Sequence, residues 1–249
     1  MGINIGIDGN GHFIGGGEIV QNDNLKLHLD PYDYGSMGAN GATDDDGKSR
    51  IKDLSAYEND MILKNDADSK SQGHWSFDGT DDGTVDFAYI ADDSDFDIGT
   101  ADFTIQMWVK LTTTNDVYLF SKWSSHTGYH LYYYNNSMRM RMNSTLVNYD
   151  NTFTWTGNWV NVAVSCDRDG DSILYHNGVV ADDDYGTPVT STISTSHNIY
   201  ISGYSSTSTT TTDNPLTGYV GPVMFYNGIA LNANQINQNF DVYRGIYGI

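Results

Sequence analysis

The sequence has 249 residues, with 32 acidic and 12 basic side chains and a net charge of −20 at pH 7. This charge repels phosphate backbones and anionic lipid surfaces, and no apolar run reaches membrane-spanning length, so nucleic-acid binding and membrane docking are disfavoured. All acidic residues except Glu18 and Glu58 are Asp, which favours turns over helix interiors. Together with an aromatic content of 13%, this composition predicts a folded, β-rich protein.

The N-terminal segment, residues 1–22, is rich in glycine and is predicted to be an arm outside a single domain over residues 23–249. Its alternating isoleucines fit either a thin strand or an arm that becomes ordered on a partner. The segment has no basic start, apolar stretch or small-residue cleavage site, so we expect no secretory signal peptide.

Strand patterns begin at residues 24–30 (NLKLHLD) and recur regularly from residue 75 onward. Residues 102–111 (DFTIQMWVKL) alternate so that Trp108 lies opposite the aliphatic stripe, where we expect it, like Trp159, to cover the second face of its sheet. In residues 138–142 (MRMRM), the methionines are predicted to face inward and the arginines outward.

The later part of the chain adds a hairpin signal and a helix signal. Asn177 and Gly178 form the strongest hairpin signal, and Asn232 is predicted to cap a helix of one or two turns that begins near Ala233. Cys166, the only cysteine, lies in an alternating strand and is expected in the core, so no internal disulfide can form. Many short strands with little helix predict a two-sheet antiparallel sandwich.

Five segments together resemble the laminin-G-like, concanavalin A-like lectin/glucanase jelly rolls. They are FDGTDD (77–82), DFTIQMWVK (102–110), LFSKW (119–123), NWVNVAVSCDRDGDSILYHNGVV (158–180) and GYVGPVMFYNGIALNANQINQNFDVYRGIYG (218–248). The resemblance implies an all-β fold, in which two antiparallel sheets form a jelly-roll sandwich with a short C-terminal helix. Its order and spacing extend over most of residues 24–249.

A narrower resemblance is carried by LDPYDYGS after the first strand and by QNF and RGIYG at the end. These features are similar to the versions of the domain in structural proteins of tailed bacteriophages. The resemblance implies a virion protein made in the host cytoplasm, a capsid decoration or fibre-type component present in many copies. Its expected partners are capsid or tail proteins, sister subunits and cell-surface glycans. A cellular carbohydrate-binding or adhesion module is the alternative.

A glycan hydrolase of the glucanase type is a second alternative. Glucanases of this superfamily carry two Glu in an E-x-D-x-x-E strand, but this chain has only two Glu, 40 residues apart, and neither lies in such a motif. The pairs Asp92/Asp93 and Asp95/Asp97 are interpreted as turn residues, and His130 and His176 as hydrogen-bonded histidines on sheet surfaces. The sequence therefore predicts a protein that is not an enzyme.

Calcium is the one cofactor that the resemblance implies. Many laminin-G-like domains bind Ca²⁺ at the rim of the sandwich, and Asp78, Asp81 and Asp82 match that motif. The C-terminal strand has Gly221 and Pro222 where the family often supplies acidic residues. The competing interpretation is that Asp78 and Asp81 bind backbone amides and hold a tight turn.

Glycan binding uses aromatic faces that stack on sugar rings, with Asn side chains nearby for hydrogen bonds. The candidate residues cluster in the middle of the chain, where each could instead pack in the core. They are Trp123, Tyr129, Tyr132, Tyr134, Asn136, Tyr149 and Trp155.

Overall fold

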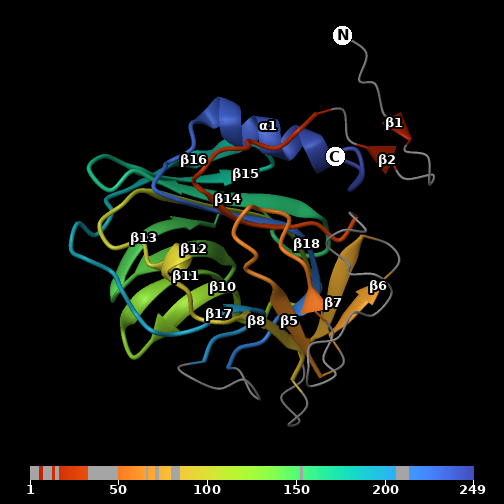
Figure 1. Ribbon diagram of the computed structural model, residues 1–249, viewed down its shortest axis with the longest axis horizontal. Coiled ribbons are helices and arrows are strands. Elements are labelled where there is room, and N and C mark those ends of the chain that lie inside the picture. The colour runs from red at the N-terminus through yellow and green to blue at the C-terminus, as the bar shows by residue number, and fades with distance from the viewer. Residues whose placement is uncertain are drawn as a thin grey trace.

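The computed structural model describes residues 6–7, 13–14, 17–32, 50–65, 67–70, 73–79, 85–151, 154–205 and 213–249. Two antiparallel sheets pack face to face, and an α-helix lies on the outer face of one of them (Figure 1). This arrangement confirms the predicted two-sheet jelly-roll sandwich with a C-terminal helix. In the described part of the chain, no helix is long and apolar enough to span a membrane.

The first sheet, here called the helix-covered sheet, has the order β16-β15-β14-β9-β18-β7-β6, and β3 also pairs with β18. The β15–β16 turn is formed by Asn177 and Gly178, with φ angles of 49° and 78°, which confirms the predicted hairpin. The strands are β3 (Leu25–Leu29), β6 (Asp68–Lys70), β7 (His74–Asp78), β9 (Phe103–Leu111), β14 (Val160–Cys166), β15 (Ser172–His176), β16 (Val179–Gly186) and β18 (Thr217–Asn227).

The second sheet, here called the tyrosine-rich sheet, has the order β13-β12-β11-β10-β17-β8-β5-β4. Apart from the two sheets, β1 (Gly6–Ile7) pairs with β2 (Phe13–Ile14), and Ser94–Phe96 form the short 3-10 helix η1. The strands of the tyrosine-rich sheet are β4 (Arg50–Ile51), β5 (Met61–Lys64), β8 (Phe87–Ile90), β10 (Val117–Ser124), β11 (Thr127–Tyr134), β12 (Ser137–Met142), β13 (Thr145–Asp150) and β17 (Ile199–Ile201).

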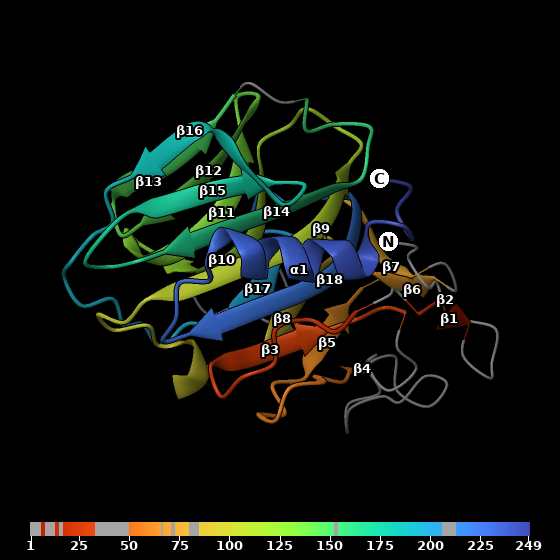
Figure 2. The ribbon, with the colours of Figure 1, turned by 90° about the horizontal axis from the view of Figure 1, so that it is seen from above.

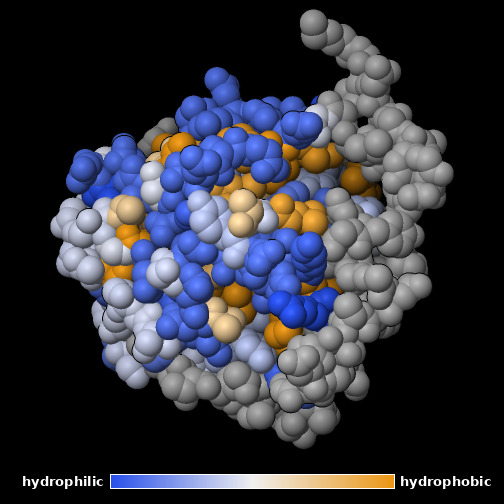
Figure 3. All heavy atoms as spheres, viewed as in Figure 1, coloured by the Kyte–Doolittle hydropathy of each residue, from blue (hydrophilic) through white to orange (hydrophobic). Residues whose placement is uncertain are grey.

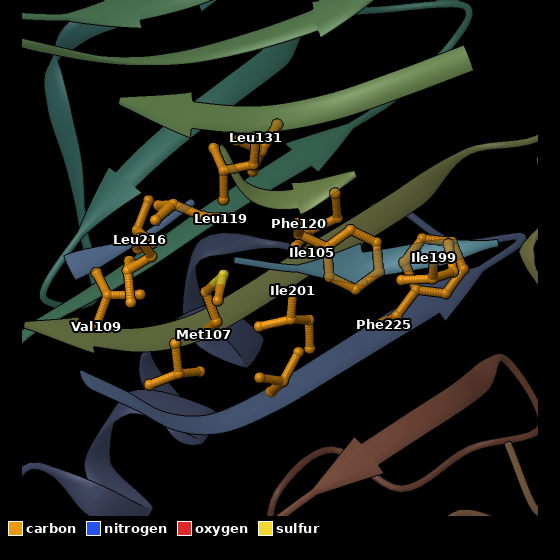
Figure 4. Packing of buried hydrophobic residues seen from close by; sticks show 14 of the residues in the cluster. Ile105, Met107, Val109, Leu119, Phe120, Leu131, Ile199, Ile201, Leu216 and Phe225 are labelled. Atoms are coloured by element: carbon orange, nitrogen blue, oxygen red, sulfur yellow. The ribbon is translucent and has the colours of Figure 1, made fainter. Parts of the chain in front are cut away.

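The core fills the space between the two sheets (Figure 4). Strand β9 contributes its predicted aliphatic stripe, and β12 contributes its three methionines, all of them fully buried. The opposite alternation turns Arg139 and Arg141 away from the core, as the sequence predicts. Cys166 is also buried, and burial raises the pKa of its thiol to about 12. The thiol is therefore a packing group, as predicted.

Helix α1 (Ala233–Tyr243) begins at Asn232, whose side chain accepts a hydrogen bond from the Gln235 amide in a capping box. The helix has 11 residues, so the prediction of one or two turns was too short. Ile236, Phe240 and Tyr243 recur at helical spacing and are buried against the sheet, which extends the helix beyond its polar beginning. Figure 2 shows α1 lying across β14, β9 and β18.

A second apolar cluster lies beneath α1, on the outer face of the helix-covered sheet. Trp108 is central to it, with its ring stacked on Phe240 and Tyr247 at centroid distances of 5.5 and 4.5 Å. Trp159 also contacts Tyr247, which confirms that both tryptophans cover the second face. Figure 3 shows hydrophobic residues, in orange, below the hydrophilic outer side of the helix.

The last residues of the predicted arm contribute to this cover. Ile19 and Val20 are buried in the cluster, and the Val20 amide donates a hydrogen bond of 2.7 Å to Asn239 Oδ1. The Glu18 carbonyl accepts a hydrogen bond from Gln238 on α1. Residues 18–20 and helix α1 are thus held together by these hydrogen bonds and by the shared apolar cluster.

Candidate functional site

The outer face of the tyrosine-rich sheet has no described helix on it (Figure 1). Cross-strand register aligns one outward-facing residue from each strand in a single row, because partners in register share a face. Crossing from β4 to β13, the row is Arg50, Ile62, Tyr89, Tyr200, Ser121, His130, Arg141 and Leu146. The row reaches the surface only at its two ends, because Tyr200, Ser121 and His130 in the middle are at most 1% exposed.

Aromatic rings gather on β10 and β11 at one end of this row. Tyr118 stacks on Tyr132 with ring centroids 5.4 Å apart, and the His130 ring lies 4.9 Å from Tyr118 and 4.7 Å from Tyr132. Trp123 meets His130 edge to face at 4.4 Å. Such contacts between ring edges and faces hold the rings rigidly in place. Together with Tyr134, these residues are called the outer aromatic cluster.

Two arginines on β12, here called the arginine pair, border the outer aromatic cluster. The Arg139 guanidinium lies over the Tyr134 ring at 4.7 Å, and that of Arg141 lies 5.7 Å from the Tyr132 ring. Both side chains are half-buried, and their Nε atoms are buried without a hydrogen-bond partner. The outer ends of the two guanidinium groups thus remain at the surface. The aromatic faces orient these planar cations.

His130 lies beneath this surface, and only 1% of it is exposed. Burial, and secondly the charge of Arg141, lowers its pKa from 6.5 to about 3, so the ring is neutral at pH 7. Neither ring nitrogen has a hydrogen-bond partner in the described structure, so the prediction of a hydrogen-bonded histidine was wrong. Because the ring is so deeply buried, His130 is in no position to accept a proton from a surface ligand.

The predicted glycan-binding residues fall into two groups. Trp123, Tyr132 and Tyr134 belong to the outer aromatic cluster, and Tyr134 is 45% exposed. Asn136 is exposed beside them in the β11–β12 turn, where its Oδ1 accepts a hydrogen bond from the Tyr133 hydroxyl. Trp123 and Tyr132 are only 7% and 4% exposed, and Trp123 lies at the other end of β11, beside Gly128. Of these four predicted residues, only Tyr134 and Asn136 are therefore exposed together at one edge.

Tyr129 and Trp155 lie on the other side of the sheet, in the core. Each is 1% exposed, and the Tyr129 hydroxyl donates to the carbonyl of Phe96. The inclusion of these two residues among surface contacts is therefore corrected: strand alternation turns Tyr129 inward. The side chain of Tyr149 lies outside the described residues, although its backbone pairs with Arg139.

The aspartates proposed for calcium are described only in part. Asp78 is exposed at the end of β7, while Asp81 and Asp82 lie outside the described residues. Asp86, which sequence reasoning did not single out, is buried and accepts a hydrogen bond from the Asp78 amide at 3.1 Å. In the described part of the chain, no three His, Cys, Asp or Glu side chains are placed to hold a metal ion. Calcium binding stays a prediction.

The aspartates considered for hydrolysis all make local contacts. Asp92 forms an ion pair with the buried Lys122, and Asp97 Oδ1 lies 3.5 Å from the same Nζ. Asp93 caps η1 by accepting from the Asp95 amide at 2.9 Å. Asp95 in turn accepts a hydrogen bond from Asn59 Nδ2 at 3.1 Å. Each carboxylate thus has a partner that accounts for its position.

A hollow of about 310 Å³ lies at the opposite end of the row, over β4, β5 and β8. Its carboxylates include Asp60, paired with Arg50 at 2.7 Å, and Asp92, paired with Lys122. The hollow is lined by Arg50, Glu58, Asn59, Asp60, Ile62, Tyr89, Ile90, Ala91, Asp92 and Asp93. The hollow is acidic, and two of its carboxylates are already paired with cations of the protein, unlike the arginines at the other end of the row.

Tyr118 and the arginine pair are the surface residues that sequence reasoning missed. The alternation in MRMRM predicts that Arg139 and Arg141 face outward, but it carries no signal for their contact with tyrosines. Those contacts depend on the register between β11 and β12, which pairs Tyr132 with Arg139. Two cations two residues apart in an acidic chain were the signal that could have identified them.

Comparison with solved structures finds the same fold in toxin binding domains. The binding domain of Paraclostridial Mosquitocidal Protein 1 is 15% identical and covers 91% of this chain and 55% of that chain, with a TM-score of 0.64. The receptor binding domain of botulinum neurotoxin D is 12% identical and covers 88% and 52%, with a TM-score of 0.62. The chain thus spans about half the length of these structures. The narrower likeness to bacteriophage proteins stays a prediction.

One of the two sequence comparisons identifies the family. No curated protein matches the chain significantly. A laminin-G-type family model, described as the concanavalin A-like lectin/glucanases superfamily, matches residues 67–237. Because this match covers more than half of the chain, the protein belongs to the concanavalin A-like lectin/glucanase superfamily.

Proposed function

We propose that this protein is a non-enzymatic attachment module that binds glycans at the edge formed by the outer aromatic cluster and the arginine pair. The observation that carries the proposal is the exposed Tyr134 ring, which lies beside Arg139 and the β11–β12 turn. A sugar ring stacks its C–H face on such an aromatic surface, while nearby amide and guanidinium groups bind its hydroxyls.

Two further observations support an attachment role. The family includes lectins, and the solved structures with this fold include the binding domain of a mosquitocidal protein and the receptor binding domain of a neurotoxin. A retaining glycosidase needs two carboxyl groups about 5 Å apart and free to react. The candidate aspartates instead hold Lys122 or cap η1, which supports a role without catalysis.

Within that role, we propose a virion component, a capsid decoration or fibre-type protein, on the strength of the sequence resemblance at the two ends of the domain. Many copies on one particle convert weak single-site glycan contacts into strong attachment. Mass spectrometry of purified virus particles that encode the chain tests this placement. Its absence from the particles would favour the cellular carbohydrate-binding module.

Glycan binding is tested on a glycan array with the protein displayed in many copies. Replacing Tyr134 by Ala should reduce binding at least tenfold, because it removes the exposed stacking face. Val179→Ala is the matched control, since Val179 is 57% exposed on β16 of the other sheet. Equal binding by the two variants would sink the proposal for this surface.

We also propose that the turn after β7 takes calcium, as the family resemblance implies. Calcium should then raise the unfolding temperature, because a ligand that binds only the native state stabilises it. Asp78→Ala should remove that increase, measured by thermal unfolding with calcium and with a chelator. The control is Asp241→Ala, an aspartate on the outer side of α1 that pairs with Arg244. An equal calcium response in wild type and Asp78→Ala would rule out a role for Asp78.

A further inference from the structure

The two arginines at the proposed glycan site stand out against the charge of the whole protein. The net charge is −20, and other cationic side chains lie beside carboxylates: Arg50 is 2.7 Å from Asp60, and Arg244 is 3.0 Å from Asp241. In the described structure, neither Arg139 nor Arg141 has a carboxylate partner. Within the described residues, two guanidinium groups on one face are therefore not paired with a carboxylate.

The geometry of β12 sets the spacing of these charges. Residues two apart on a strand share a face and lie about 7 Å from each other along it. Each guanidinium rests against a tyrosine of the neighbouring strand, Arg139 on Tyr134 and Arg141 near Tyr132. A guanidinium beside an aromatic ring presents its outer N–H groups as a planar fork, the arrangement that binds an oxyanion in a bidentate manner.

The arginine pair and the neighbouring Tyr132 contain hydrogen-bonding atoms without a partner. The Nε atoms of both arginines and the Tyr132 hydroxyl are buried and have no partner within the described structure. A buried polar group without a partner costs about 1–3 kcal/mol, so folded proteins rarely leave several together. These buried atoms do not reach a ligand themselves, so a ligand at this edge meets the outer N–H groups of the two guanidinium groups.

We propose that the arginine pair makes the glycan site selective for acidic sugars, those that carry a carboxylate or a sulfate. This inference rests on the proposed function, because it names the sugar class that the site takes. The acidic group binds the guanidinium fork while a neighbouring sugar ring stacks on Tyr134. The net charge of −20 repels polyanions over longer distances, so the ligand carries isolated acidic groups on an otherwise neutral glycan.

The experiment uses the full chain on an array of matched glycans that share one neutral core, with the core bare, carboxylated or sulfated. Wild type should bind at least one acidic member tenfold or more tightly than the bare core. The carboxylated and sulfated members show which acid the fork accepts. Raising the salt concentration should weaken the binding of acidic members more than that of the bare core.

Three variants test the assignment to the arginine pair. The double replacement Arg139→Gln and Arg141→Gln should bring the affinities for acidic and neutral members within twofold of each other, whatever binding to the neutral core remains. Arg139→Lys keeps the charge but loses the fork, so its preference should be intermediate. Arg244→Gln, on the opposite side of the molecule, is the control and should keep the wild-type preference. Unfolding temperatures confirm that every variant is folded.

The outcomes separate this inference from the function on which it rests. If wild type binds neutral and acidic members equally, or if the double variant keeps the preference, the acid selectivity is overturned and glycan binding at the site stands. If no member of the array binds, the proposed function fails together with the inference.

Discussion

The outer faces of the two sheets are both aromatic, but they differ in how their polar groups are satisfied. Under α1, the buried side chains of Gln106, Tyr226 and Asn239 are hydrogen-bonded to one another and to the backbone. On the tyrosine-rich sheet, Tyr132, His130 and the arginine pair leave buried polar atoms without partners. In the described structure the face under α1 has one such atom as well, Trp108 Nε1. Aromatic content therefore does not distinguish a packing face from a binding face, whereas the number of buried polar atoms without a partner differs between the two faces.

The largest difference in stability between variants of the two faces should come from the apolar residues under α1. Phe240→Ala removes a ring that is 5% exposed and stacks on Trp108, so the free energy of unfolding should fall by about 3–4 kcal/mol. Denaturant unfolding measures this change. Tyr134→Ala, on the other face, should cost less than about 1 kcal/mol. Equal losses would mean that both faces are structural.

The polar network under α1 should give the next largest effect. Asn239 accepts a hydrogen bond from the Val20 amide at 2.7 Å and donates to Gln106 Oε1 at 2.9 Å. Asn239→Leu leaves both partners buried without a hydrogen bond and should lower the free energy of unfolding by about 2–3 kcal/mol. Asn237→Leu is the control, because Asn237 is exposed and its side-chain amide donates a hydrogen bond to Asp241 at the surface of α1. A loss no larger than that of the control would contradict the network.

Much of the fold could be predicted from alternation. The two faces of β9 and the outward arginines of β12 follow from residues two apart sharing a side. The length of α1 could not be predicted from its polar first turns. Its later turns are stabilised by packing against the apolar cluster that contains Trp108. Local propensity is overridden there by tertiary packing.

The candidate site was harder to predict than the fold. Trp123, Tyr132 and Tyr134 were identified because aromatic residues are recognisable by type. Tyr129, one of the same run of tyrosines, faces the core because the alternation places it beside Leu131 and Tyr133 on the inner side. Which arginine meets which tyrosine depends on the register of two strands, and no local pattern encodes that register.

The next prediction concerns the pH dependence of stability that the buried His130 causes on the tyrosine-rich sheet. Its pKa is about 3 in the folded protein against an ordinary 6.5, so the unfolded chain binds more protons between these values and stability falls as the pH decreases through them. Between about pH 7 and 5.5, above the range in which most carboxylates titrate, this loss amounts to about 1 kcal/mol.

His130→Phe keeps a ring in the cluster and should remove that part of the pH dependence, which denaturant unfolding at the two pH values measures. Some dependence remains, because burial also lowers the pKa of His176. His126→Phe, at an exposed turn position, serves as the control and should behave as wild type. An unchanged slope in His130→Phe would show that this ring is not held neutral by burial.

The smallest expected change in stability comes from removing one tyrosine hydroxyl on each face. The Tyr226 hydroxyl donates to the Val20 carbonyl at 2.9 Å and accepts from Asn239 Nδ2 at 3.1 Å, so Tyr226→Phe should cost about 1 kcal/mol. The buried Tyr132 hydroxyl has no partner in the described structure, so Tyr132→Phe should leave stability unchanged or raise it by up to about 1 kcal/mol.

The sign of the Tyr132→Phe change decides whether that face holds unused hydrogen-bonding capacity. If the variant is at least as stable as wild type, the buried hydroxyl contributes nothing to the stability of the fold. A loss as large as that of Tyr226→Phe would mean that the hydroxyl is satisfied in the free protein. The contrast between a satisfied packing face and an unsatisfied binding face would then no longer hold.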